Sequence, residues 1–203
     1  MLTNGPFSNR IAYLLGFVVL FLAMILIGFQ LYFPSPALPK IRVLPDFKLT
    51  ERMGSERQLS DLKGKVWLAD LVYTTCPSTC PMLSHRFSGL QAEAFKNPAV
   101  RFVSISVNPS HDTPEVLRAY ADQFHADSGK WWFLTGDKEK VQTFLETGLQ
   151  LGSKASPENG TEFLHSTKIV LVDKNGVIRA YYEGVEGDVN ALILRDIRRL
   201  LKE

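Results

Sequence analysis

The chain contains two cysteines, Cys76 and Cys80, which stand four residues apart in the segment YTTCPSTCP. Such a close pair indicates a metal-binding or redox-active site, because a disulfide-stapled secreted scaffold has more cysteines, spread along the chain. Two thiolates are soft donors suited to copper(I) or zinc, but a closed structural zinc site takes four ligands. A third ligand must therefore come from elsewhere. Met82 could add a thioether, although we expect it to face the core.

The four histidines are the candidates for that third ligand. His85 follows the cysteine pair on a predicted helix, turned away from its apolar face, and His111 and His125 fall in or beside polar loops. His165 directly precedes the predicted strand 168–173, in a loop that a mixed α/β sheet can bring beside the cysteine turn. We favour His165 as the ligand over the alternative of an ordinary hydrogen-bonded loop histidine.

The cysteines lie between a predicted strand and a predicted helix. Residues 65–73 are mostly apolar, which is typical of a strand buried on both faces, and residues 81–95 carry apolar side chains at helical spacing. Pro81 fits the first turn of that helix, so Cys80 is expected at its N-cap. A thiol at a helix N-terminus has a lowered pKa. The pair also sits at the carboxyl end of a strand, where open α/β sheets bind their ligands.

The rest of the chain alternates between predicted strands and helices, which indicates a three-layer α/β domain with a mixed central sheet over residues 45–203. A first hairpin is expected around Met53–Gly54, and an Asn-Gly turn predicts a second one at residues 174–176. The remaining strands are predicted at 100–107, 131–134, 168–173 and 177–182, and the helices at 113–124, 137–147 and 188–201.

The N-terminal region predicts a membrane anchor. Residues 1–10 form a tail, residues 11–33 are long and apolar enough for a transmembrane helix, and residues 34–44 are a proline-containing linker. Basic residues after the span mildly favour a cytoplasmic domain, but folded domains translocate largely regardless of such charges. The balance of 23 basic and 21 acidic residues, without a basic cluster, argues against a nucleic-acid partner.

Three segments, KVWLADLVYTTCPSTCPM, SISVNPSHDTPEVLRAYA and FLHSTKIVLVD, resemble the Sco/SenC family of copper proteins. The resemblance implies a thioredoxin-like fold behind a membrane anchor, and a copper(I)/copper(II) site formed by Cys76, Cys80 and His165. It also implies a copper chaperone for the dinuclear copper centre of cytochrome c oxidase. Asn108 departs from the family, which commonly has aspartate there; the three ligands are unaffected, but a local turn or a partner contact could change.

From this resemblance we expect a metal carrier rather than an enzyme. Its partners would be the copper-bearing oxidase subunit and other copper carriers or thiol reductants. The expected location is the plasma (inner) membrane, with a single pass and an extracytoplasmic C-terminal domain.

The main alternative is a thiol–disulfide oxidoreductase acting on an oxidase subunit or another copper protein. Asp70, six residues before Cys76, matches the buried aspartate of thioredoxins, although a strand-end carboxylate satisfied by backbone donors would look the same. Two features count against thioredoxin chemistry: three residues separate Cys76 from Cys80 instead of two, and residues 165–167 contain no proline. A purely structural assembly factor is a third possibility.

Overall fold

The protein is described here from a computed structural model that covers residues 6–32, 36–151, 154–155, 163–164, 166–185 and 187–203. It divides into two compact units, residues 1–37 and 38–203. The first contains helix α1 (Pro6–Tyr32). Among the described residues, no helix combines the length and the apolar character needed to cross a membrane. Part of the expected span at 11–33 lies outside those residues, so the anchor stays a prediction.

The second unit is built on a mixed sheet, as predicted. Within the described residues, eight strands join it in the order β1-β10-β9-β4-β5-β6-β2-β3. The central strands β4, β5 and β6 are parallel, and all other pairs are antiparallel. The strands are β1 (Arg42–Val43), β2 (Lys48–Glu51), β3 (Glu56–Gln58), β4 (Val66–Val72), β5 (Val100–Ser106), β6 (Trp131–Thr135), β9 (Lys168–Val172) and β10 (Val177–Glu183).

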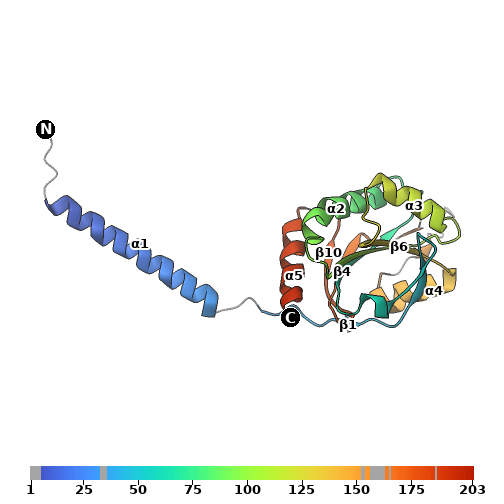
Figure 1. The fold of residues 1–203 in the computed structure, drawn as a ribbon, viewed down its shortest axis with the longest axis horizontal. Helices are drawn as coiled ribbons and strands as arrows, with labels where there is room; N and C mark the ends of the chain where they lie inside the picture. Colours follow the sequence, from blue (N-terminus) through green and yellow to red (C-terminus); the bar gives the residue numbers. More distant parts are fainter. Residues whose placement is uncertain (1–5, 33–35, 152–153, 156–162, 165, 186) are drawn as a thin grey trace. The chain divides into compact units, whose positions relative to one another are not determined.

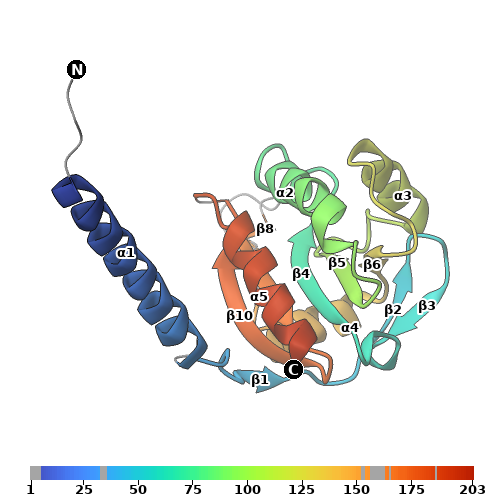
Figure 2. The same cartoon turned by 60° about the vertical axis from the view of Figure 1, so that its left-hand side comes forward.

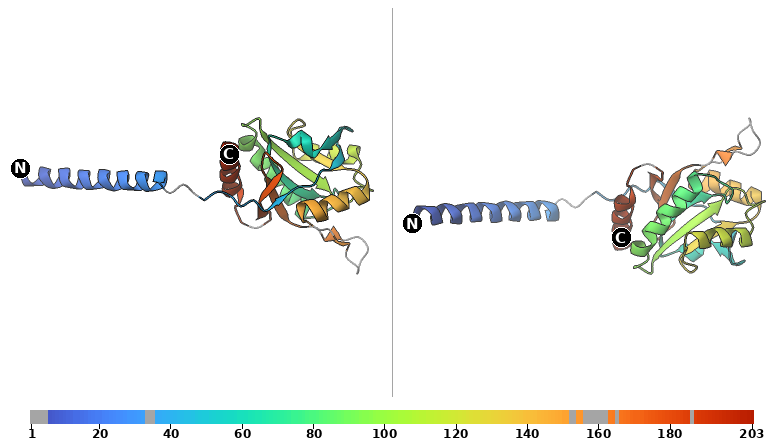
Figure 3. Two further views of the ribbon diagram at one scale, coloured as in Figure 1. Left: turned by 90° about the horizontal axis from the view of Figure 1, so that it is seen from below. Right: turned by 90° about the horizontal axis from the view of Figure 1, so that it is seen from above.

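Helices cover both faces of this sheet (Figure 1). They are α2 (Thr79–Ala94), α3 (Pro114–Gln123), α4 (Lys138–Thr143) and α5 (Asn190–Lys202). Figure 3 shows α2 and α3 in front of the sheet from one side, and α4 in front of it from the other. Helix α5 packs against α2 and β4, as Figure 2 also shows. The three-layer α/β arrangement predicted from the sequence is therefore confirmed.

Local sequence explains most of these elements. Thr113 caps α3 by accepting the Val116 N–H, with Pro114 at the first helical position, as expected. The predicted helix 137–147 is shorter than expected: α4 ends at Thr143, and a wider π-helical turn (Phe144–Leu149) follows. In that turn Phe144 packs against Phe47, with 4.6 Å between ring centroids. The two-residue strands β1, β7 (Lys154–Ala155) and β8 (Phe163–Leu164) were not predicted.

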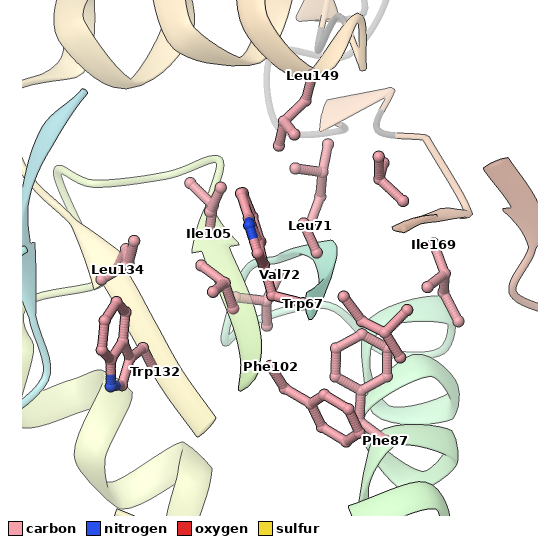
Figure 4. Close-up of a cluster of buried hydrophobic side chains, with 14 of the residues drawn as sticks. Trp67, Leu71, Val72, Phe87, Phe102, Ile105, Trp132, Leu134, Leu149 and Ile169 are labelled. Atoms are coloured by element: carbon pink, nitrogen blue, oxygen red, sulfur yellow. The ribbon is translucent and has the colours of Figure 1, made fainter. Parts of the chain in front are cut away.

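The hydrophobic core lies on both sides of β4, whose seven residues are all buried. In Figure 4, Trp67 and Leu71 of β4 point toward Leu149, whereas Phe87 of α2 lies beside Phe102 on the opposite side of the sheet. The rings of Phe87 and Phe102 are 4.8 Å apart. Burial on both faces explains why this strand is apolar except for Asp70, and it gives the turn after the strand a rigid support.

Candidate metal centre

The turn after β4 uses the sulfur of Cys76 to cap the next helix. The N-cap residue of α2 is Ser78, which makes no side-chain capping bond. Instead, the backbone N–H of Cys80 donates to Cys76 Sγ at 3.3 Å. The expectation that Cys80 occupies the N-cap is therefore wrong, because α2 begins one residue before it, at Thr79. The thiol of Cys76 satisfies a donor that a polar N-cap side chain would otherwise bind.

The two thiols, which are buried and form no disulfide, have opposite pKa shifts. For Cys76, burial raises the pKa, but hydrogen bonds from the backbone of Cys80 and Ser78, with smaller side-chain contributions, bring the net pKa below its ordinary value. For Cys80, burial raises the pKa strongly, and the Tyr73 N–H at 3.4 Å only partly opposes this. The lowered pKa expected for the thiol at the helix start is therefore wrong for Cys80 and is found instead for Cys76, which is the thiol that ionises more readily.

Cys76 also borders an open cavity between α2 and α3. The cavity measures about 610 Å³, and its walls include Cys76, His85, Tyr120 and Phe124. His85 is exposed and meets the ring of Phe124 edge-on at 5.0 Å. Cys80 does not line this cavity and is fully buried. A ligand or partner group in the cavity would therefore reach Cys76 first.

Asp70 lies on β4, fully buried beneath the site. Its Oδ1 accepts a 2.6 Å hydrogen bond from Ser104 Oγ, which in turn accepts the indole N–H of Trp131 at 3.0 Å. Its Oδ2 is buried and has no hydrogen-bond partner within the described part of the chain. Burial raises the pKa of Asp70 to about 7, although the bond from Ser104 opposes the shift. Asp70 also raises the pKa of Cys80, after burial and Cys76 as larger causes.

A second buried carboxylate, Asp112, fixes the cysteine turn, and the sequence analysis missed it. Its Oδ1 accepts the hydroxyl of Thr74 at 2.6 Å, and its Oδ2 accepts the hydroxyl of Ser106 at 2.6 Å. His111 Nδ1 lies 3.2 Å from Asp112 Oδ1 and 3.4 Å from Thr74 Oγ1. Asp112 thus joins the turns that follow β4 and β5. The sequence did contain a signal for Asp112: it lies in a polar loop after a buried strand, directly before Thr113, the N-cap of α3.

The other predicted site residues are placed as follows. His165 lies outside the described residues, so its role as a ligand stays a prediction. Met82 has 52% of its surface exposed, and the expectation that it faces the core is wrong, because the neighbouring residue Leu83 takes the buried position on α2. Asn108 forms the turn through its carbonyl oxygen, which accepts the N–H groups of His111 and Asp112 at 3.0 and 2.9 Å.

Known proteins resemble this chain in sequence and in fold. The sequence pattern of the family described as SCO1/SenC matches residues 36–202. A SCO1/SenC family lipoprotein from Bacillus anthracis is similar in structure, with a TM-score of 0.72 and 36% identity over 78% of this chain and 94% of that one.

Two further structures are similar to the chain. BsSco, a Sco-family cytochrome c oxidase assembly protein in which a disulfide switch was identified, has a TM-score of 0.72 and 28% identity over 82% of this chain and 98% of its own. Bradyrhizobium japonicum ScoI with copper bound has a TM-score of 0.67 and 25% identity over 79% of this chain and 100% of its own.

Proposed function

The chain belongs to the SCO1/SenC family, and we propose that it is a copper chaperone that supports assembly of the dinuclear copper centre of cytochrome c oxidase. Cys76, Cys80 and His165 would hold copper(I) or copper(II). The proposal is supported by the copper-bound structure of ScoI and by the description of BsSco as an oxidase assembly protein. The copper-bearing oxidase subunit would be the partner that receives the metal.

The observation that carries this proposal is the hydrogen bond from the Cys80 N–H to Cys76 Sγ, which brings the two cysteines together in one helix-capping turn. The lowered pKa of Cys76 favours the thiolate that soft metal ions bind. Metal binding would deprotonate Cys80 as well, because a coordinated thiol loses its proton. The two sulfur donors therefore fit copper(I). A third ligand, the imidazole nitrogen of His165, would let the site bind copper(II) as well.

A carrier must also release its cargo, and the cavity beside Cys76 supports this step. Cys76 borders about 610 Å³ of open space, whereas Cys80 is fully buried. A partner ligand would approach copper from the side of Cys76, form a shared intermediate, and displace Cys80 last. Three protein ligands leave room for the incoming donor, which a closed four-ligand site would not.

A titration of the full chain in detergent with copper(I) tests the thiolate site. The reduced protein should bind one copper ion with high affinity, and the same protein oxidised to the Cys76–Cys80 disulfide should lose that affinity, because only thiolates coordinate strongly. Re-reduction of the oxidised sample should restore binding, which controls for damage during oxidation. Full affinity in the oxidised protein would show that the pair does not hold the metal.

The second candidate function is thiol–disulfide exchange, which the surroundings of Asp70 favour. The Cys76 thiolate would attack a partner disulfide, form a mixed disulfide and release one partner thiolate. Asp70, with its pKa raised to about 7, would take the proton of Cys80. The Cys80 thiolate would then attack Cys76 Sγ, which leaves a Cys76–Cys80 disulfide and releases the second partner sulfur as a thiolate. The partner disulfide is the oxidant, and the two electrons come from the dithiol.

We also propose that residues 11–33 anchor the protein to the plasma membrane with a single pass, between a tail (1–10) and a linker (34–44). The domain 45–203 would then be extracytoplasmic. The sequence supports this, because residues 11–29 contain no charged side chain. Burying apolar side chains in lipid stabilises by about 25 cal/mol per Å². A membrane-impermeant thiol reagent should label Cys76 in intact spheroplasts. Labelling only after lysis would show that the domain faces the cytoplasm. Release of the protein from membranes by carbonate would show that residues 11–33 are not an anchor.

A further inference from the structure

Gly184, in the loop between β10 and α5, packs closely between helix α2, which carries Cys80, and the start of β9. Its N–H donates to the carbonyl of Thr167 at 2.9 Å. A methyl group on Gly184 would overlap Leu83 Cδ2 of α2 and lie 2.6 Å from the Thr167 carbonyl oxygen. Leu83 is three residues after Cys80, and Thr167 is two residues after His165. Only a residue without a side chain allows α2 and the start of β9 to approach this closely.

Arg86 of α2 holds the same loop from the other side. Its Nε donates to the carbonyl of Gly184 at 2.7 Å, its Nη1 to Asn190 Oδ1 at 2.8 Å and its Nη2 to the carbonyl of Gly187 at 3.0 Å. All three contacts go to residues that follow β10. The planar guanidinium satisfies them together, which an ammonium group or an amide could not do in this geometry. Arg86 therefore ties the helix that carries Cys80 to the loop that contacts Thr167.

The start of β9 is fixed by further contacts with the end of β10. Thr167 Oγ1 donates to Glu183 Oε2 at 3.3 Å, and Lys168 Nζ lies 3.4 Å from Glu183 Oε1. Glu183 and Lys168 also face each other in the register of the two strands. The chain at residues 167–168 is thus held from β10 and, through Gly184, from α2.

We infer that Gly184 and Arg86 are positioning residues, which set the separation between α2, where Cys80 lies, and the start of β9, two residues after the proposed ligand His165. This inference rests on the proposed copper site. It follows from the contacts of Gly184 with the buried side chain of Leu83 on α2 and with the backbone carbonyl of Thr167 before β9. Copper(II), which prefers nitrogen donors more than copper(I) does, should respond most to a change in this separation.

The test compares the full-length variants Gly184→Ala and Arg86→Gln with Gly89→Ala. Gly89 lies on the same helix α2, and a methyl group there meets no atom within 4 Å. Copper(II) affinity and the thiolate-to-copper absorption band should change in the first two variants, with a loss of affinity of about 10–100-fold, which is typical when a residue that orients a metal ligand is altered. Gly89→Ala should match the parent, and copper(I) affinity should fall less in every case.

Thermal unfolding of the metal-free variants separates positioning from loss of the fold. Arg86→Gln keeps the glycine and so tests the same link if Gly184→Ala fails to fold. Either folded variant with the copper(II) band and affinity of the parent would overturn the inference. If His165→Ala loses copper(II) and these variants do not, the inference alone fails. If the parent itself binds no copper(II), the proposed function fails first and the inference with it.

Discussion

Replacing Asp70 with asparagine should change how the stability of the reduced protein depends on pH. The folded protein keeps the Asp70 carboxyl protonated up to its pKa of about 7, against an ordinary value of 3.8, because burial disfavours the charge. The unfolded chain ionises it above about pH 4. The parent therefore loses stability relative to the variant as pH rises from 4 to 7, and the difference is constant above that range.

The size of the effect follows from the shift. A change of one pKa unit corresponds to about 1.36 kcal/mol, so a shift of roughly three units amounts to about 4 kcal/mol as an upper bound. Between pH 4 and 7, the free energy of unfolding of Asp70→Asn minus that of the parent should increase by up to about 1.4 kcal/mol per pH unit. Taking this difference cancels the contribution of Cys76, whose pKa is shifted in the opposite direction.

Urea unfolding of the reduced protein at pH 4.5 to 8 measures this difference directly. Asp46→Asn serves as the matched control, because it makes the same replacement at an exposed position. A difference between Asp70→Asn and the parent that stays constant over the whole range would show that the carboxyl is not held protonated by the fold. The proton-acceptor role of Asp70 in thiol exchange would then lose its basis.

Three further outcomes are expected. Asp112→Asn should lower the free energy of unfolding by about 1–3 kcal/mol in chemical denaturation, because the hydroxyls of Thr74 and Ser106 lose their carboxylate acceptor; a loss below about 0.5 kcal/mol would contradict the role of Asp112. Brief treatment with iodoacetamide at pH 7, followed by peptide mapping, should modify Cys76 before Cys80, because Cys76 has the lower pKa and borders the cavity; preferential labelling of Cys80 would refute this order. Phe87→Ala should cost about 3–5 kcal/mol in the same denaturation assay, because the ring is fully buried against Phe102; near-parent stability would mean that the core repacks around the gap.

Much of the fold could be predicted from local patterns. Neighbouring residues determine three of these signals: the mostly apolar sequence of β4, the Thr113–Pro114 start of α3 and the Asn175–Gly176 turn between β9 and β10. The two-residue strand β1 could not be found in this way, because it is defined by the pairing of Arg42 and Val43 with residues 177–178, far along the chain.

The candidate site was predicted in part. The spacing of the cysteines located the turn, but the exact start of α2 depends on Cys76 Sγ acting as the capping acceptor, which no propensity describes. The opposite pKa shifts of the two thiols depend on burial in the tertiary structure. Asp112 and Gly184 act through contacts between segments that are distant in sequence, with Thr74 and Leu83 respectively, and so escaped a reading of the cysteine motif alone.

The central claim is that two thiolates and the imidazole of His165 hold copper, and a copper(II) titration of His165→Ala beside Asp70→Asn tests it most directly. His165→Ala should lose tight copper(II) binding and the thiolate-to-copper absorption band, while both cysteines remain reducible and the fold survives. Asp70→Asn should keep the band and lose at most about 10–100-fold in affinity, as expected for a group outside the ligand set. If His165→Ala binds copper(II) as tightly as the parent, with an unchanged spectrum, His165 is not a ligand and thiol–disulfide exchange becomes the better account of this protein.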